Sequence, residues 1–338
     1  MKKLPTIERQ VVSLSREKLV KTEWLQPGQS LPLVVKPAVD GVNLIDWAKL
    51  NQSWITSQLR QYGGILFRNF EQNGVEEFED FIGVVSGELL EYRERSSPRS
   101  HVSGNVYTST DYPADRSIFL HNENSYQYKW PLKIFFFCLQ PAQQGGATPI
   151  ADVRKIFQRL RPKIRDKFAQ KQVMYVRNYG DGFGLDWQDV FQTTDKIKVE
   201  DYCRSHQIEF EWKSGNRLRT KQIRQAVRRH PQTGEFVWFN HAAFFHVSTL
   251  EPCLRQSLLT GFQEEDLPHN TYYGDGSPIE DFVLEEIREA YRQETIAFPW
   301  RLGDILMLDN MLVAHGRAPF VGQRKVVVGM SEPYSGES

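Results

Sequence analysis

The spacing of apolar residues along the chain predicts several helices. Between residues 46 and 62 the large apolar side chains recur at helical intervals along one face, at Trp47, Leu50, Trp54 and Leu59. The pair Gly63-Gly64 is expected to end this helix. Similar patterns predict helices over residues 74–86, 152–170 and 280–295. Helices therefore account for only a minority of the chain.

Short apolar runs rich in β-branched and aromatic residues predict strands between these helices. The runs are residues 65–67, 134–139, 173–176, 208–212, 235–239, 304–308 and 325–328. Many short strands with a few helical insertions favour a mainly β fold, a jelly-roll barrel flanked by α-helices. Barrels of this kind hold small ligands in their mouths.

One predicted strand carries unusual polar residues. Residues 118–126 begin as an apolar, β-prone segment and include His121, Asn122 and Glu123. Successive side chains of a strand face opposite sides, so His121 and Glu123 are expected to point into one space. Asn122 would then face the other side. The run therefore places an imidazole and a carboxylate together.

The pattern also divides the chain into regions. Residues 1 to about 30 are polar without a clear period, and we expect them to form an N-terminal arm. A jelly-roll core is expected over about 60–335, within a single domain that covers 1–338. The polar segment 91–113 leads into the run that carries His121. Such a segment is typical of a substrate loop or lid.

Composition narrows the class of protein. Of the 338 residues, 40% are hydrophobic and 12% aromatic, which is enough for a large core. The 42 Lys and Arg residues balance the 42 Asp and Glu residues, so no net charge favours nucleic acid or an anionic membrane as partner. The basic run 217–229 is interpreted as a solvated surface segment. These observations favour a globular protein with a sizeable core.

The cysteines and the termini add two expectations. Cys138, Cys203 and Cys253 are widely spaced, which argues against a disulfide framework or a zinc site, and Cys138 reads as a small core residue. The N-terminus lacks the apolar segment of a signal peptide. No apolar stretch approaches the ~20 residues that a membrane span needs. A soluble, cytoplasmic protein is expected.

A third candidate metal ligand accompanies His121 and Glu123. His315 lies far downstream, within the run 311–317. Two imidazoles and one carboxylate on one face of a metal form the triad of non-heme iron(II) oxygenases, which leaves adjacent positions open for a co-substrate and oxygen. Each residue alone has an ordinary explanation, since a lone His-x-Glu pattern is usually accidental and a lone histidine is more often a satisfied core or surface residue. The three together predict a metal site.

Several short motifs, taken in order, resemble one family. They are His121-Asn122-Glu123, the run 145–152, the run 300–304, Asp309-Asn310, His315-Gly316-Arg317 and Gln323-Arg324. Together they resemble the TauD/TfdA (taurine dioxygenase/clavaminate synthase-like) superfamily of Fe(II)/2-oxoglutarate-dependent oxygenases, whose fold is a double-stranded β-helix, a cupin-like jelly roll. The likeness runs from about residue 60 to residue 335 and is strongest to the syringomycin-cluster (SyrP-like) amino-acid hydroxylase type. The taurine-dioxygenase branch has aspartate at the position of Glu123, whereas the clavaminate-synthase branch has glutamate, so in this respect the chain resembles the latter.

The resemblance implies a cofactor set. His121, Glu123 and His315 would bind Fe(II), with 2-oxoglutarate and O2 as co-substrates. Arg324 would bind the far carboxylate of 2-oxoglutarate, and Thr148 would assist. The chemistry agrees, because a planar guanidinium grips a carboxylate through two parallel hydrogen bonds and a hydroxyl adds another donor. The adjacent Lys325 leaves open which of the two positions matches the family's arginine. Taken alone, Arg324 would be an exposed charge at a strand end, and Thr148 would be a residue at a helix N-terminus.

Residues near these motifs are candidates for substrate contacts: Arg95, Arg99, Tyr107, Asn124, Asn240 and Arg317. Arg95 and Arg99 would clamp a substrate carboxylate, although a solvated loop explains them equally well. Asn240 follows a predicted strand together with His241 and His246, and core packing explains their aromatic neighbours. Neither histidine suits the role of a fourth iron ligand, because it would block a position that the chemistry needs.

The activity that the resemblance implies is hydroxylation of an unactivated C–H bond, coupled to decarboxylation of 2-oxoglutarate to succinate. The substrate would be an amino acid or a derivative, free or bound to a peptidyl carrier protein, in specialised-metabolite or nonribosomal-peptide biosynthesis. The same cofactors would serve desaturation or epoxidation. A jelly-roll protein that binds metal or ligand without turnover is the alternative from another class, and it would leave Arg324 and Thr148 without a use. A metal-dependent hydrolase would need a general base, and none stands out near the triad.

Overall fold

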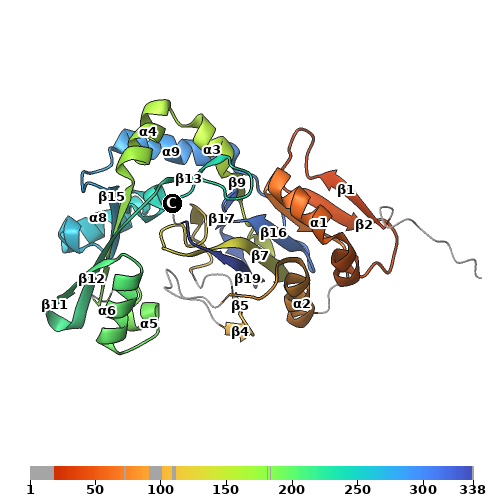
Figure 1. Ribbon diagram of the computed structural model, residues 1–338, viewed down its shortest axis with the longest axis horizontal. Coiled ribbons are helices and arrows are strands. Elements are labelled where there is room, and N and C mark those ends of the chain that lie inside the picture. The colour runs from red at the N-terminus through yellow and green to blue at the C-terminus, as the bar shows by residue number, and fades with distance from the viewer. Residues whose placement is uncertain are drawn as a thin grey trace, which may run out of the picture.

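The computed structural model describes residues 19–71, 74–90, 101–108, 112–180, 182 and 184–336. Its largest sheet has the strand order β1-β2-β3-β16-β7-β19-β5-β4 (Figure 1). These strands are β1 (Val20–Trp24), β2 (Leu33–Pro37), β3 (Gly64–Phe67), β4 (His101–Ser103), β5 (Val106–Thr108), β7 (Trp130–Gln140), β16 (Ile305–Asp309) and β19 (Lys325–Tyr334). β2 and β3 pair in parallel, while β7 pairs antiparallel with both β16 and β19. Strands from both ends of the chain therefore meet in one sheet.

A second sheet carries the residues of the predicted metal site. Its order is β6-β17-β9, and both pairings are antiparallel. The strands are β6 (Ile118–His121), β9 (Ile150–Asp152) and β17 (Val313–Arg317). A short ladder between β8 (Gln144–Gly145) and β18 (Phe320–Val321) continues beside it. The described strands thus form open sheets that face each other, the arrangement of a double-stranded β-helix.

The helices fall into three groups around these sheets (Figure 1). They are α1 (Leu44–Tyr62), α2 (Val75–Ser86), α3 (Val153–Arg159), α4 (Pro162–Lys171), α5 (Trp187–Phe191), α6 (Lys196–Ser205), α7 (Ala242–Phe245), α8 (Pro252–Gly261) and α9 (Asp281–Glu294). Short 3-10 turns lie at η2 (Ser214–Asn216), η3 (Val247–Thr249) and η4 (Glu264–Asp266). No described helix has both the length and the apolar character that a membrane crossing requires.

The large sheet separates two apolar cores because its side chains alternate between faces. On β7, Phe135 and Phe137 face a core completed by α1 and α2. Ile134, Phe136 and Cys138 face the opposite core, which the second sheet completes. Full burial of such a side chain contributes about 1.5–3 kcal/mol. The alternation fixes which face of β7 lies toward the metal site.

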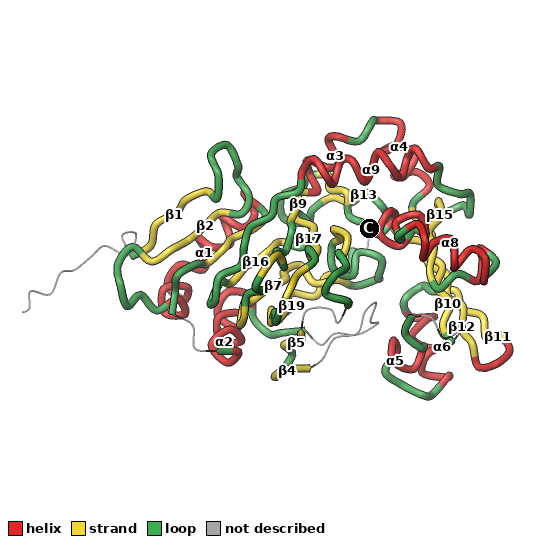
Figure 2. The backbone as a smooth tube through the Cα atoms, turned by 180° about the vertical axis from the view of Figure 1, so that it is seen from behind, coloured by secondary structure: helices red, strands yellow, loops and turns green. Residues whose placement is uncertain are grey.

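The middle of the chain adds a separate four-stranded sheet in the order β11-β12-β10-β15 (Figure 2). Its strands are β10 (Val173–Tyr179), β11 (Glu209–Lys213), β12 (Arg217–Arg224) and β15 (His269–Tyr273). A hairpin of β13 (Val227–Arg229) and β14 (Phe236–Trp238) follows β12. Residues 173–273, inserted between the two halves of the jelly roll, therefore build one wall near the metal site and a hairpin that reaches α1.

Most predicted elements are confirmed. The helix predicted over 46–62 is α1, which begins after Asn43 and ends at Gly63, a residue with φ 79°. The helices predicted over 74–86 and 280–295 are α2 and α9. Each predicted strand after residue 60 also has its counterpart, and β7 and β19 extend beyond the predicted runs. Cys138, Cys203 and Cys253 form no disulfide.

Two predicted boundaries are wrong. Val20–Trp24 forms a strand in place of the irregular arm expected to about residue 30, because pairing with β2 uses backbone groups and leaves polar side chains exposed. The helix predicted over 152–170 divides into α3 and α4. Pro162 causes the break, since proline lacks an N–H donor and disfavours a helical conformation in the residue before it. The extent of the single domain stays a prediction.

The interpretation of 217–229 as a solvated segment is also wrong. β12 lies inside the four-stranded sheet, paired on both sides with β10 and β11. Arg219 and Arg224 are buried, at 8% and 5% exposure. The Arg219 guanidinium donates to Asn178 Oδ1 and Asp266 Oδ1, so the buried charge is compensated. These partners lie far away in sequence.

Candidate metal centre

His121 and His315 meet as partners across two strands. They lie directly opposite each other in the pairing of β6 with β17. Residues in this relation project from the same face with Cβ atoms about 4.5–5.5 Å apart. Their ring centroids are 4.6 Å apart. A Cβ at Gly316 would lie 2.6 Å from the Ile118 carbonyl oxygen, so only glycine permits this approach of the strands.

Glu123 reaches the site from a turn. β6 ends at His121, and residues 123–126 form the turn that follows. The expectation that His121 and Glu123 alternate within one strand is therefore wrong. The turn instead swings the carboxylate toward β17, where Glu123 Oε2 lies 3.6 Å from His315 Nε2. The two residues converge by a different route from the one predicted.

The donor set fits one divalent iron ion. Ligand atoms of His121, Glu123 and His315 all lie within 4.8 Å of one another. The Nδ1 of His121 contacts the Phe119 carbonyl oxygen at 2.8 Å, which leaves Nε2 of the neutral ring to bind metal. Glu123 and His315 are 2% and 4% exposed, and His315 Nδ1 is a buried atom without a hydrogen-bond partner in the described part of the chain. A buried carboxylate between two imidazoles calls for a cation.

Apolar rings enclose the imidazoles. Phe244 of α7 stacks on His121 with centroids 4.7 Å apart and an angle of 10° between the planes. Phe136 of β7 lies 5.0 Å from His315. These rings exclude water from two sides of the site and hold the imidazoles in place.

A third imidazole lies beside the ligands without belonging to the triad. The His241 ring is 5.6 Å from that of His121, and its Nδ1 lies 2.6 Å from Ser125 Oγ. Burial, followed by the nearby His121, holds the pKa of His241 well below 6.5. His241 is therefore neutral at physiological pH and presents a polar edge inside an apolar enclosure.

Arg324 and Thr148 form a basic cluster near the second sheet, where Thr148 comes two residues before Ile150, the partner of His315 on β9. Arg324 Nε donates to the Gly146 carbonyl oxygen at 2.8 Å, and Arg324 Nη2 donates to Thr148 Oγ1 at 3.3 Å. Trp300 Nε1 donates to the same oxygen at 3.0 Å. Because Thr148 Oγ1 accepts both bonds, its own O–H remains to donate elsewhere. A Cβ at Gly146, where φ is 69°, would lie 3.0 Å from Arg324 Cδ, so glycine is needed beside this guanidinium.

The electrostatics around Arg324 favour an anion. Burial and, after it, the nearby charge of Arg317 lower the pKa of Arg324 to about 10. The guanidinium stays charged at neutral pH, and a bound carboxylate would relieve both effects. Cys138 also lies close, and burial raises its pKa to about 12, so its thiol is neutral. Arg324 and Thr148 therefore lie in hydrogen-bond contact. Their role toward 2-oxoglutarate stays a prediction.

The predicted substrate residues are distributed unevenly. Arg317 donates to the carbonyl oxygens of Tyr112, Pro113 and Arg116, so its guanidinium holds that loop. Tyr107 lies on β5 and packs into the inner core at 3% exposure. Arg95 and Arg99 lie outside the described residues. Their roles toward substrate stay predictions.

Two asparagines near the site differ in what their amides do. Asn240 donates to the Ala226 carbonyl oxygen and accepts from the Ala242 N–H, which ties β13 to α7. Asn124 follows Glu123 directly with φ 56°, and its Oδ1 is buried without a hydrogen-bond partner among the described residues. Of the two, Asn124 is the better placed to contact a bound molecule.

Sequence reasoning missed residues that support the ligands. Asn310 and Trp300 lie in motifs of the resemblance, which signalled their presence without a role. Ser125 and Phe244 carried no signal, because their contacts with His241 and His121 depend on the turn after β6 and on the inserted helix α7. Only the folded arrangement reveals them.

Comparison with known proteins gives a consistent picture. The family model described as "Taurine catabolism dioxygenase TauD, TfdA family" matches residues 27–330. The dapdiamide synthesis protein DdaC of Enterobacter agglomerans is 42% identical over 275 residues, covering 81% of this chain and 84% of that protein. A clavaminate synthase-like protein of Arabidopsis thaliana is 26% identical, covering 90% and 91%.

Solved structures share the fold at low sequence identity. The PvcB protein from Pseudomonas aeruginosa superposes with a TM-score of 0.56 at 14% identity, covering 95% of this chain and 94% of that one. AAD-2 in complex with Mn(II) and N-oxalylglycine gives a TM-score of 0.53 at 13% identity, covering 94% and 98%. These similarities support the double-stranded β-helix.

Proposed function

Because this chain belongs to the TauD, TfdA family of dioxygenases, we propose that it oxidises an unactivated C–H bond of an amino acid or amino-acid derivative. The enzyme class follows from the family: it is a 2-oxoglutarate-dependent non-heme iron dioxygenase, as the motifs predicted. The single observation that carries the proposal is the convergence of the ligand atoms of His121, Glu123 and His315. The assignment to the syringomycin-cluster type stays a prediction.

Each part of the site has a task in this reaction. When bound, iron(II), 2-oxoglutarate and oxygen supply the oxidant, and 2-oxoglutarate leaves as succinate and carbon dioxide. His121, Glu123 and His315 would hold the iron through one face, which leaves the other face to co-substrate and oxygen. Arg324 would orient 2-oxoglutarate by pairing with its far carboxylate, and the Thr148 hydroxyl would donate to the same group.

The walls of the site would protect the reaction. Phe244 and Phe136 keep water from the imidazoles, so that the oxidant meets the substrate rather than solvent. His241 contributes a neutral imidazole edge near His121, suited to a hydrogen bond with a polar substrate group. The protein thus binds, orients and encloses, while the cofactors perform the oxidation.

Two observations support an amino-acid-type substrate. Arg177 of β10 is 7% exposed, lies 5.5 Å from the Tyr126 ring and 5.1 Å from the Tyr179 ring, and its charge lowers the pKa of His241. A positive charge near His241 favours a substrate that carries a carboxylate. The relative that is 42% identical is named for dapdiamide synthesis, a biosynthetic role. A peptidyl carrier protein as partner rests on the resemblance alone.

The decisive experiment supplies Fe(II), oxygen and 2-oxoglutarate with a panel of amino acids, free or loaded on a carrier protein. Succinate should form in step with a product that gains the mass of one oxygen atom. H121A should form no succinate, and R324A should lose about 10- to 100-fold in apparent 2-oxoglutarate affinity, since a charged hydrogen bond contributes ~1.5–3 kcal/mol. R204A, which removes an exposed arginine of α6, is the matched control and should match wild type.

Each outcome has a distinct reading. A product lighter by two hydrogen atoms would identify desaturation, and oxygen gained across a double bond would identify epoxidation. Binding of metal and 2-oxoglutarate without succinate for any substrate would favour a non-catalytic binding protein. Wild-type succinate formation by H121A or R324A would contradict the assignment of these residues.

A further inference from the structure

Asn310 holds the backbone of the metal ligand Glu123 on both sides. Asn310 Oδ1 accepts from the Glu123 N–H at 2.7 Å, and Asn310 Nδ2 donates to the Glu123 carbonyl oxygen at 2.9 Å. The same Nδ2 donates to the Pro131 carbonyl oxygen at 2.8 Å. The side chain is 0% exposed. Asn310 therefore pairs with Glu123 much as a neighbouring strand would.

The backbone of Asn310 strengthens this clamp. Its N–H donates to the Leu132 carbonyl oxygen at 2.8 Å, and its carbonyl oxygen accepts from Asn122 Nδ2 at 2.7 Å. Three of these five hydrogen bonds hold Glu123 and its neighbour Asn122, and all five come from one residue in the connection between β16 and β17. Since β17 carries His315, the clamp joins the support of the carboxylate to the support of the distal imidazole.

The clamp matters because β6 ends before Glu123. His121 and His315 are fixed by direct strand pairing, whereas Glu123 lies in a turn without such pairing. A turn residue that ligates metal needs another constraint on its position. Asn310 supplies such a constraint, because it accepts from the Glu123 N–H and donates to the Glu123 carbonyl oxygen.

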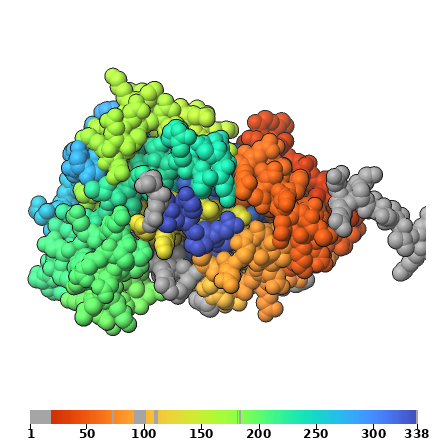
Figure 3. Space-filling view, in the orientation of Figure 1, coloured from red at the N-terminus to blue at the C-terminus, as the bar shows by residue number. Residues whose placement is uncertain are grey.

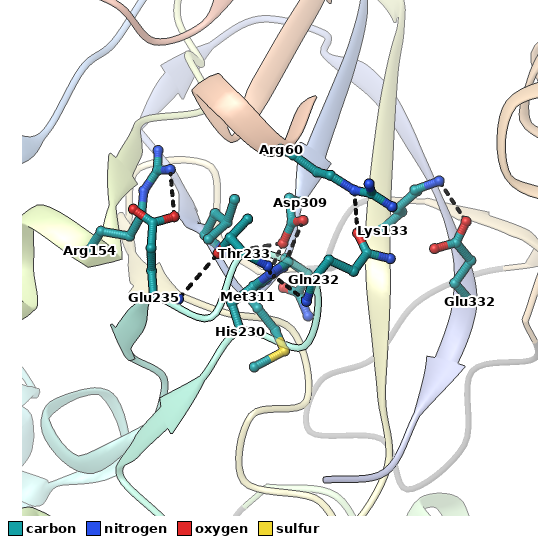
Figure 4. A network of polar contacts seen from close by, with 12 residues as sticks. Arg60, Lys133, Arg154, His230, Gln232, Thr233, Glu235, Asp309, Met311 and Glu332 are labelled. Atoms are coloured by element: carbon teal, nitrogen blue, oxygen red, sulfur yellow. Dashed lines mark hydrogen bonds and ion pairs between the residues drawn. The ribbon is translucent and has the colours of Figure 1, made fainter. Parts of the chain in front are cut away.

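A buried pair next to Asn310 extends the support outward (Figure 4). Asp309 Oδ1 accepts from the Met311 and Leu312 N–H groups, and Asp309 Oδ2 lies 3.0 Å from His230 Nε2. His230 Nδ1 accepts from the Gln232 and Thr233 N–H groups, so Nε2 carries the proton and donates to Asp309. The carboxylate is thereby held in one orientation.

The pair connects the metal region to the surface. His230 and Gln232 belong to the hairpin loop between β13 and β14, and Arg60 of α1 donates to Gln232 Oε1 at 2.9 Å. In Figure 3 the teal hairpin lies against the orange helix α1. A continuous set of hydrogen bonds thus runs from α1 through the hairpin to Asp309, the residue before Asn310.

We propose that Asn310 is a positioning residue for the metal carboxylate: it clamps the Glu123 turn against the β16–β17 connection, and the His230–Asp309 pair holds that connection in place. The inference rests on the proposed function, since it assumes that Glu123 binds the metal. Asn310 would therefore raise metal affinity without contacting the ion itself.

The test measures Co(II) binding by calorimetry and visible absorption, without 2-oxoglutarate or turnover. N310A should bind Co(II) about 10- to 100-fold more weakly than wild type, the range typical of lost outer-sphere support. Its absorption spectrum should resemble that of E123A, because the carboxylate is displaced while both imidazoles remain. H230A, one step further from the ligand, should lose less affinity than N310A.

Asn178 offers a matched control. Its Nδ2 donates to the carbonyl oxygens of Glu265 and Leu267, and its Oδ1 accepts from Arg219, so it is also a buried backbone clamp, but in the four-stranded sheet. N178A should lower the urea midpoint of unfolding and leave Co(II) affinity within twofold of wild type. A general loss of stability would instead weaken Co(II) binding in N178A and N310A alike, and that result would overturn the proposal.

The remaining outcomes separate the inference from the function. If N310A does not fold, N310D decides, because it keeps the acceptor for the Glu123 N–H and loses the donor to the Glu123 carbonyl oxygen. N310D should fall between wild type and E123A in Co(II) affinity. Wild-type affinity in N310D or N310A, with weak binding by E123A, refutes the positioning role alone. Equal binding by wild type and E123A refutes the metal site itself.

Discussion

Thr148 shows how one side chain can be prepared for a ligand by its neighbours. Its oxygen already accepts hydrogen bonds from Trp300 and Arg324, which directs the hydroxyl proton away from both. A group with one donor left and a cation beside it is suited to a carboxylate. The preparation is complete before any ligand binds, so little reorganisation is needed.

Replacing this hydroxyl tests the argument. T148V keeps the size of the side chain and removes the donor, and a single hydrogen bond contributes about 1 kcal/mol. The dissociation constant for 2-oxoglutarate, measured by calorimetry on Mn(II)-loaded protein, should rise about fivefold. T148S should restore wild-type affinity, and Mn(II) affinity should not change in either variant. An unchanged dissociation constant in T148V would show that the Thr148 hydroxyl does not contribute to 2-oxoglutarate binding.

His246 illustrates how burial couples one residue to pH. Its Nδ1 accepts from the Ser248 N–H at 3.1 Å and so caps η3. Burial and the charges of Arg288 and Arg255 lower the pKa of His246 to about 4, although the charge of Asp281 opposes this shift. Between pH 6.5 and pH 4 the unfolded chain therefore takes up a proton that the folded chain refuses. Stability is lost as the pH falls through this window.

The variant H246N should remove that dependence, because asparagine keeps an acceptor for Ser248 and does not titrate. Between pH 7 and pH 4.5, wild type should lose up to about 2 kcal/mol more unfolding free energy than H246N. Urea titrations at the two pH values give the comparison. Parallel losses in both proteins would show that His246 takes up its proton in the folded state.

At the scale of elements, α4 and α9 show which force holds a helix to the fold. The two helices lie together at the top of Figure 1. Two ion pairs connect α4 with α9 and the residues that cap them: Arg161 with Glu286, and Lys167 with Glu280. Phe168 of α4 is 0% exposed and packs on Trp238 at 5.0 Å. Apolar burial should dominate, because exposed ion pairs contribute little.

Two substitutions compare these forces directly. F168A should lower the unfolding free energy by roughly 3–5 kcal/mol, since it leaves a cavity in the core. E286Q removes the ion pair with Arg161, whose side chain is 62% exposed, and should cost about 0–1 kcal/mol. Urea unfolding of both variants measures the difference. A larger effect of E286Q than of F168A would reverse this ranking.

Element prediction succeeded where a segment carries its own pattern. β7, β16 and β19 have continuous apolar runs, and α1 and α9 have one apolar face, so local sequence is sufficient. β12 was missed because its arginines are buried only through partners such as Asn178 and Asp266, distant in sequence. Similarly, the two histidines of the site were predictable from motifs, whereas the turn that delivers Glu123 depends on Asn310, 187 residues away.

At the scale of the whole molecule, the site lies where separate parts of the chain meet. The second sheet supplies the two imidazoles, and the large sheet supplies Phe136. The loop before β19 supplies Arg324, and the insertion supplies His241 and Phe244. A ligand that contacts all these parts should stabilise the fold as a unit. Binding and folding are linked, because the unfolded chain has no such site.

Thermal unfolding measures this linkage. Mn(II) and 2-oxoglutarate at about a hundred times their dissociation constants should each add ~2.7 kcal/mol, or a Tm increase of roughly 4 °C for a chain of this length. The 2-oxoglutarate increment should require metal, and EDTA should reverse both. E123A should show neither increment. A 2-oxoglutarate increment without metal would indicate binding outside the proposed centre.

The ending of β6 at His121 also has a kinetic consequence. Paired strands open only in larger cooperative units, whereas a turn outside the strand ladder can open locally. During slow dissociation of the ion, Glu123 should dissociate from it first, and the imidazoles of His121 and His315, which lie on paired strands, should dissociate last. A chelator can then capture the half-released ion, so the rate of metal loss should increase with chelator concentration instead of matching the rate of global unfolding.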